Sequence, residues 1–134
     1  MAYQGYLIKL GEQILPHKYI KADSFATTLI TQDLDSYRDM EGVLHRTALQ
    51  HRVNKIEFET PAMLTNAQVN ELINIISSNY INSAEKKVLA TIYVPEIDDY
   101  MTQEMYVPDI SFSIYGIFKG VIRYNPIRIA FIAY

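Results

Sequence analysis

The chain has 134 residues, of which 49% are hydrophobic and 20% charged, values typical of a single globular domain with its own core. It contains no cysteine, which excludes disulfides and thiolate metal sites. A net charge of −3 argues against a free-standing nucleic-acid binder, and the longest apolar stretch, 127–134, is too short to span a bilayer. With no signal peptide evident, we expect a soluble protein made in the cytoplasm, without membrane contact.

The first half of the chain predicts β-strands, because β-branched and aromatic residues alternate with polar ones. A short extended segment is also expected at Tyr19 and Ile20. The predicted strands are Gln4–Leu10, Ser24–Gln32 and Arg52–Thr60.

Residues 33–50 are too polar for a core strand and show no helical stripe. We expect a long loop or a hairpin here, with its turn at Glu41–Gly42, where glycine supplies a positive φ. A segment of this length in a small domain is typical of a functional or partner-binding element.

One α-helix is predicted, from Asn66 to about Tyr80. Thr65 and Gln68 have the spacing of a capping box, and Leu64 and Val69 that of a hydrophobic staple. The helix carries one apolar stripe, so it needs a sheet to cover. The stripe is formed by Val69, Leu72, Ile73 and Ile76.

The second half of the chain again predicts strands, and residues 96–99 have the polarity of a hairpin loop. The last strand is apolar and is interpreted either as an edge that pairs with another subunit or as a buried central strand. The predicted strands are Lys87–Val94, Tyr100–Val107, Ile110–Tyr115, Val121–Tyr124 and Ile127–Tyr134. The fold class is therefore β-dominated α+β, a split barrel or sandwich of six to eight mostly antiparallel strands with one flanking helix.

No catalytic, cofactor-binding or metal-binding motif is evident. The three histidines lack the spacing of a zinc site, Asp98 and Asp99 are interpreted as a solvated turn, and phosphate-binding glycine motifs are absent. We therefore expect neither an enzyme nor a cofactor.

The remaining candidate site is a contact surface within the polar segment. Arginines with intervening acids and an aromatic residue suit an adaptable interface, while a hairpin whose arginines pair with its own aspartates is an equal alternative. The candidate interface residues are Tyr37, Arg38, Asp39, Gly42, Leu44, His45 and Arg46.

Several segments resemble an uncharacterised family of small Firmicute prophage proteins encoded among tail genes. They are Thr31–Asp39, Gly42–Arg46, Val94–Glu96, Gln103–Tyr106 and Tyr124–Arg128. The order of elements also resembles the phage tail-tube fold of tube proteins and baseplate adaptors, which implies one tail-tube-like domain over residues 1–134. In that fold a long hairpin or loop between early strands reaches a neighbouring subunit or the next ring, a role that here falls on residues 37–46.

The resemblance implies a structural component of a bacteriophage tail, located in the virion tail and assembled in the bacterial host cytoplasm. The expected partners are further copies of the chain, in a hexameric or trimeric ring, and neighbouring tail proteins. As a tube-like or adaptor subunit it would line or extend a channel through which DNA passes without specific binding. The alternative is a non-catalytic tail-tip module that binds host-surface carbohydrate or another tail protein, because tyrosines and acidic loops suit such contacts.

Overall fold

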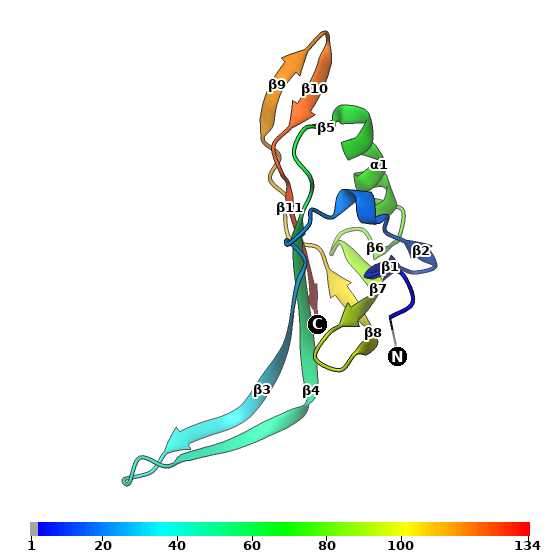
Figure 1. Ribbon diagram of the computed structural model, residues 1–134. Helices are drawn as coiled ribbons and strands as arrows, with labels where there is room; N and C mark the ends of the chain where they lie inside the picture. The colour runs from blue at the N-terminus through cyan, green and yellow to red at the C-terminus, as the bar shows by residue number, and fades with distance from the viewer. Residues whose placement is uncertain (1–2) are drawn as a thin grey trace.

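Two antiparallel sheets and one helix make up the computed structural model (Figure 1). It describes residues 3–134, apart from the side chains of residues 31–35 and 47–52. The elements are β1 (Ile8–Leu10), β2 (Gln13–Ile14), the 3₁₀ helix η1 (His17–Tyr19), β3 (Ala26–Arg38), β4 (Leu44–Glu59), β5 (Leu64–Thr65), α1 (Asn66–Ser77), β6 (Tyr80–Asn82), β7 (Lys87–Val94), β8 (Asp99–Tyr106), β9 (Ile114–Phe118), β10 (Val121–Tyr124) and β11 (Arg128–Ala133).

The predicted β-dominated α+β class is confirmed, although over residues 3–134 neither sheet closes into a barrel. The large sheet has the order β2-β1-β7-β8-β11-β4-β3, with β6 paired to β7, and the small sheet has the order β5-β10-β9. The described chain holds eleven strands rather than six to eight, because short pairings such as β2, β5 and β6 leave too little periodic pattern to be recognised.

The last strand lies in the middle of the large sheet, between β8 and β4. Ile129, Ala130 and Phe131 are buried in succession, as expected for a strand covered on both faces. The interpretation of this strand as an exposed edge is therefore wrong, and the central-strand alternative is correct.

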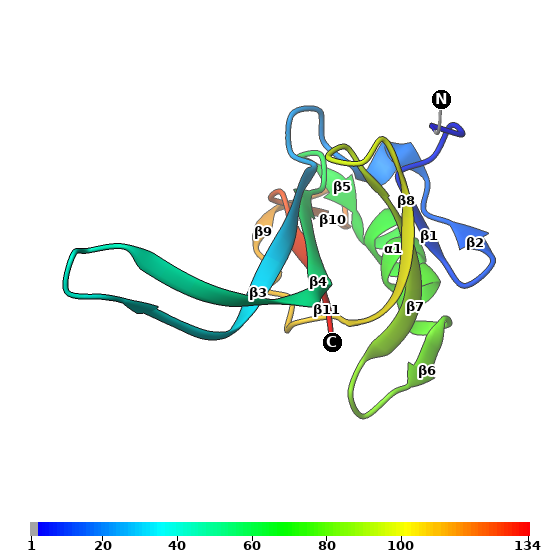
Figure 2. The same ribbon diagram turned by 90° about the horizontal axis from the view of Figure 1, so that it is seen from below.

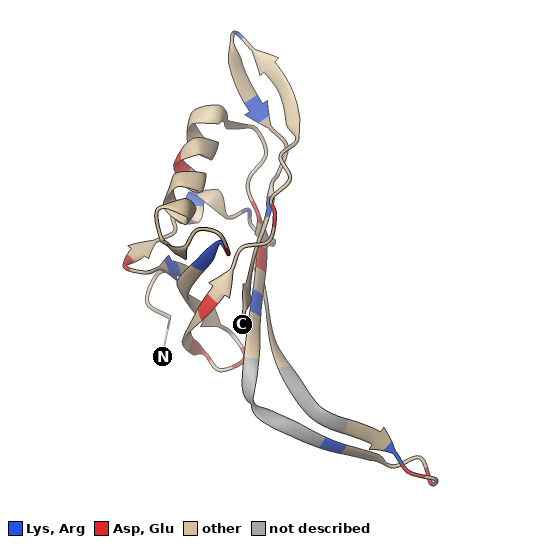
Figure 3. Cartoon of the chain, turned by 180° about the vertical axis from the view of Figure 1, so that it is seen from behind, with Lys and Arg blue, Asp and Glu red and all other residues tan. Residues whose placement is uncertain are grey.

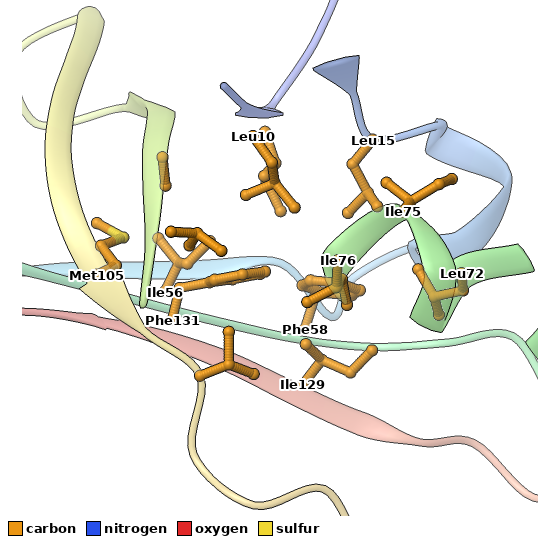
Figure 4. Close-up of a cluster of buried hydrophobic side chains, with 14 of the residues drawn as sticks. Leu10, Leu15, Ile56, Phe58, Leu72, Ile75, Ile76, Met105, Ile129 and Phe131 are labelled. Atoms are coloured by element: carbon orange, nitrogen blue, oxygen red, sulfur yellow. The ribbon is translucent and has the colours of Figure 1, made fainter. Parts of the chain in front are cut away.

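The core lies between α1 and the large sheet (Figure 4). Ile56 and Phe58 of β4 and Phe131 of β11 are fully buried there, as is Leu72 of α1. Strand β7 contributes every second residue, which is the pattern of a strand with one face on the core. On the helix Ile75 is buried, while Ile73, predicted for the apolar stripe, is only partly buried at the margin of the core.

The start of α1 is confirmed, and its end is three residues earlier than predicted. Thr65 Oγ1 accepts a hydrogen bond from the Gln68 N–H at 3.3 Å, and Gln68 Oε1 accepts one from the Thr65 N–H at 3.0 Å. At the other end, Asn79 Nδ2 donates to the Ile75 carbonyl at 2.7 Å and satisfies a terminal acceptor. The chain then leaves the helix, and Tyr80 pairs with Val88 of β7.

Three predicted strands are corrected by the structure. Of Gln4–Leu10 only Ile8–Leu10 pairs, because Gly5 has a φ of 92° and breaks the extended chain. Tyr19 belongs to a 3₁₀ turn rather than an extended segment. The alternating stretch from Ile110 is unpaired until Ile114. Just before that point, Ser113 accepts two hydrogen bonds from Asn125, one from its N–H to the Ser113 carbonyl and one from Nδ2 to Ser113 Oγ.

Two hairpins project from opposite ends of the molecule (Figure 1). Strands β3 and β4 continue well beyond the core as a long antiparallel pair, which extends to one side in the view from below (Figure 2). Strands β9 and β10 form the shorter hairpin at the other end. Residues 33–50, for which the sequence predicts a long loop or a hairpin, belong to two paired strands and their connecting turn.

Candidate subunit interface

The outer part of the β3–β4 hairpin brings the candidate interface residues together. Tyr37 lies opposite His45 in the register, and Arg38 lies opposite Leu44. The rings of Tyr37 and His45 stack with centroids 4.9 Å apart and planes inclined by 13°. No residue of this part of the chain belongs to the buried core, so backbone pairing and local side-chain contacts hold it in place.

The turn at 39–43 is built around Asp39. Its Oδ1 accepts hydrogen bonds from the N–H groups of Glu41 and Val43, both at 3.0 Å, in the manner of an Asx turn. The Gly42 N–H donates to the Asp39 carbonyl at 3.0 Å, and Gly42 has a φ of 84°, which glycine adopts without steric cost. Arg38 Nη1 donates to the Gly42 carbonyl at 2.9 Å, which closes the turn from the side.

Asp39 is paired with a histidine rather than with an arginine. His45 Nε2 lies 2.9 Å from Asp39 Oδ2. This hydrogen bond, with the donors of Val43 and Glu41, lowers the pKa of Asp39 below its ordinary value of 3.8. The alternative hypothesis expects the hairpin's arginines to pair with its own aspartates. Arg38 instead donates to the backbone carbonyl of Gly42.

The hairpin presents apolar side chains to solvent. Met40 is 104% exposed and Tyr37 57%, and Val43 and Leu44 are also exposed. Exposed aromatic and methionine side chains beside arginine are the composition typical of protein interfaces. Met40 and Val43 are not among the predicted interface residues, although they flank the predicted turn at Glu41–Gly42, and the structure adds them by their exposure.

The β9–β10 hairpin is a second exposed apolar element, which the sequence analysis missed. Ile114, Tyr115, Ile117 and Phe118 are all exposed, and Phe112 precedes them. The sequence shows an apolar run here, but the predicted strands Ile110–Tyr115 and Val121–Tyr124 leave residues 116–120 unassigned, so the sequence does not predict a hairpin.

The described part of the chain contains no cluster of three His, Asp or Glu side chains placed to bind a metal ion. Among the same residues, no helix has the length and apolar character needed to cross a membrane.

Comparisons with known proteins bear on the fold and the family. The structure is similar to a chain in the tail of an empty gene transfer agent particle of C6 symmetry, with a TM-score of 0.52 and 17% identity over 99% of this chain and 95% of that one. A chain in the virion of a native gene transfer agent particle is similar to the same extent, with a TM-score of 0.52 and 17% identity over 99% and 95%. No curated protein sequence matches the chain. At this identity the two likenesses show a shared fold, whereas the family is shown by sequence: the chain belongs to the family of unknown function DUF6711, which matches residues 1–134.

Proposed function

We propose that this protein is a structural component of a phage-type tail, a tube-like or adaptor subunit that forms a ring around the DNA channel. The observation that carries the proposal is the similarity in fold, over 99% of the chain, to a tail chain described with C6 symmetry. Six copies of a single domain spanning residues 1–134 would then close the ring.

The open edge of the large sheet supports assembly by strand pairing. Strand β3 is the last strand in the sheet order, and it is 13 residues long. A long edge strand carries a row of backbone donors and acceptors that favours pairing with another chain. Repeated pairing of this edge with the neighbouring subunit, under rotational symmetry, would generate a closed ring in which the β3 edge is covered.

The β3–β4 hairpin supports contact beyond the ring. Its outer residues 37–46 lie away from the core and include both basic and acidic positions (Figure 3). Apolar side chains among them are exposed. Such a surface contributes nothing to the buried core of its own subunit, and it suits contact with a neighbouring subunit or with the next ring.

The test is the mass of the purified protein by light scattering over a concentration series, followed by negative-stain imaging. We expect rings with a central hole, and we expect the double reversal Arg38→Glu with Arg46→Glu to abolish their stacking. The matched control is Lys18→Glu with Lys86→Glu, which makes the same charge change at two exposed ion pairs on the body of the molecule.

A strict monomer at every concentration, with no rings in the presence of other tail proteins, would overturn the ring proposal. It would favour the alternative of a tail-tip binding module, which should remain small and gain thermal stability from its ligand.

A further inference from the structure

Four tyrosines form a cluster on the face of β7 and β8 that points away from the core, beside the loop that joins these two strands. The Tyr6 and Tyr100 rings stack with centroids 4.7 Å apart, and Tyr93 meets Tyr100 edge to face at 5.5 Å. Tyr3 meets Tyr93 in the same way at 5.6 Å. None of the four belongs to the buried core, so the cluster adds aromatic area to the surface and not to the interior.

Hydrogen bonds hold the cluster in one arrangement. Tyr100 Oη donates to the Tyr6 carbonyl at 2.7 Å and accepts from the Gln4 N–H at 2.9 Å. Tyr93 Oη donates to Asp98 Oδ1 at 2.5 Å. Tyrosines that are fixed in this way lose little freedom when they bind, which is one reason why tyrosine is enriched in protein interfaces.

The loop beside the cluster is acidic. Asp98 and Asp99 are exposed, and residues 93–100 contain no basic residue. Asp98 accepts from the Tyr93 hydroxyl, and Asp99 Oδ1 accepts from the Tyr100 N–H at 2.8 Å, so these bonds pair neither carboxylate with a cation. Together with the exposed Ile97, these residues form a surface that we call the tyrosine–acid patch. Its members are Tyr3, Tyr6, Tyr93, Ile97, Asp98, Asp99 and Tyr100.

The rings of the patch already contact one cation of their own chain. Lys9 Nζ lies 5.6 Å from the centroid of the Tyr6 ring. Cation–π contacts of this kind are weak in water and become stronger where a partner excludes it. Against the two aspartates, this single ammonium group leaves the patch negative. The patch therefore suits a partner that is both apolar and basic.

The tip of the β9–β10 hairpin has these properties. Residues 114–124 contain Lys119 and Arg123 and no acidic residue. Lys119 lies in the two-residue turn, and Ile117 and Phe118 beside it are 67% and 49% exposed. Strand β9 is also the edge of the small sheet, and an apolar edge strand favours association unless a partner covers it.

The tip of the β3–β4 hairpin matches the patch less well, because it carries both signs of charge. Arg38 and Arg46 lie there beside Asp39 and Glu41. At the patch, these two acidic side chains would meet further carboxylates. The β9–β10 tip brings no such repulsion.

The patch and the β9–β10 tip lie at opposite ends of the body of the molecule. Figure 1 shows the β9–β10 turn at the top and the loop between β7 and β8 at the lower end of the body. In Figure 3 that loop carries acidic positions, and the β9–β10 hairpin carries basic ones. The two surfaces of one molecule therefore cannot meet each other, but they can meet on two copies.

We propose that the tyrosine–acid patch of one copy binds the tip of the β9–β10 hairpin of a second copy, with Lys119 against the tyrosine rings and the two aspartates. The contact uses two different surfaces, so it is heterologous and propagates from copy to copy instead of closing on a dimer. The inference rests on the proposed function, because it adds a contact between copies along the tail that is separate from any contact of the β3–β4 hairpin.

The test uses site-directed cross-linking, which is clean here because the chain has no cysteine. A variant with Ile97→Cys and Ile117→Cys keeps every charged residue, and it is treated with a short bis-maleimide reagent and separated on a denaturing gel. We expect a ladder of covalent multimers from this variant and a dimer from an equimolar mixture of the two single variants. The matched control, Ile117→Cys with Ile81→Cys, places the second thiol at another exposed isoleucine and should give no ladder.

A charge exchange within the double-cysteine variant provides the second readout. Lys119→Glu and Asp99→Lys, each alone, should lower the yield of the ladder at least about tenfold, because like charges then meet or the attraction is lost. An equimolar mixture of the two should restore it, since alternating copies again bring opposite charges together. The matched control is Glu85→Lys, which makes the same charge change at an exposed residue near the other end of β7 and should leave the yield unchanged.

The outcomes separate this inference from the proposed function. Rings without the ladder, or a ladder that neither reversal affects, would overturn the contact and leave the ring intact. A ladder without rings would support the contact and count against the ring. A ladder from Ile117→Cys with Val43→Cys in place of the Ile97→Cys pair would assign the β9–β10 tip to the β3–β4 hairpin and overturn the proposal.

Discussion

At the scale of single residues, Asp39 organises the tip of the long hairpin. Its carboxylate accepts hydrogen bonds from two backbone N–H groups and lies within hydrogen-bond distance of His45. All three interactions favour the ionised form, and they lower its pKa. One side chain thus fixes the turn that presents Met40 and Val43.

The order of the tip should therefore depend on pH. Because the pKa of Asp39 in the folded hairpin lies below the ordinary 3.8, its contribution is complete above about pH 3.8 and is lost as the pH falls through the lowered value. Carboxyl-detected NMR titration should give a midpoint below 3.8, and His45→Ala should move that midpoint upward. His17→Ala, at a histidine outside the hairpin, should leave it unchanged, and equal midpoints in wild type and His45→Ala would contradict the assignment.

At the scale of elements, the capping box fixes where α1 begins. Thr65 and Gln68 exchange hydrogen bonds across the first turn, while Leu64 and Val69 are both buried beside it. The helix start is thereby set next to β5, whose Leu64 and Thr65 pair with β10. The cap therefore links the helix to the base of the β9–β10 hairpin.

Removal of the cap should cost measurable stability. Thr65→Ala should lower the free energy of unfolding by about 1 kcal/mol, since the Gln68 N–H loses its acceptor. Thr65→Ser keeps the hydroxyl and should retain most of that stability. Urea unfolding followed by circular dichroism measures both variants, and equal losses in the two would show that packing of the threonine methyl group, and not the cap, is responsible.

At the scale of the whole molecule, the buried core and the two hairpins with exposed apolar side chains lie in different parts. The buried cluster draws on α1 and on the large sheet, and it contains no residue of the outer hairpin 36–46. The two hairpins hold exposed apolar side chains at opposite ends instead. Under the proposed function, the core folds within one subunit, and the exposed hairpins make their contacts with other subunits afterwards.

Shortening of the long hairpin should separate the two properties. Replacement of residues 36–46 by Asn-Gly joins the paired residues Asp35 and Thr47 through a tight turn. The melting temperature should change by less than about 4 °C, because the deletion removes surface only. Size-exclusion chromatography with light scattering should show loss of the stacked species, and unchanged stacking would contradict a role for the hairpin in assembly.

Features that depend on neighbours along the chain can be predicted from the amino-acid sequence. The β-dominated class, the capping box at Thr65 and the position of the turn at Glu41–Gly42 all follow from hydrogen bonds and side-chain periodicity within a few residues. These interactions involve residues that are close together in the chain, so a short stretch of sequence is enough to predict them.

Which strands pair and which surfaces remain exposed depends on contacts between distant parts of the chain, and these are known only from the structure. Strand β11 pairs with β4, beginning with Arg128 opposite Glu59 in the register. Because β11 also pairs with β8, this contact between distant parts of the chain makes the last strand central. The polar residues 33–50 form strands because the hydrogen bonds between strands use backbone groups only. Where the strands do not pack on the core, polar side chains are therefore tolerated on both faces. For β9, the apolar pattern is typical of a buried strand, and its exposure follows from its place at the edge of a small sheet, beyond the reach of the core.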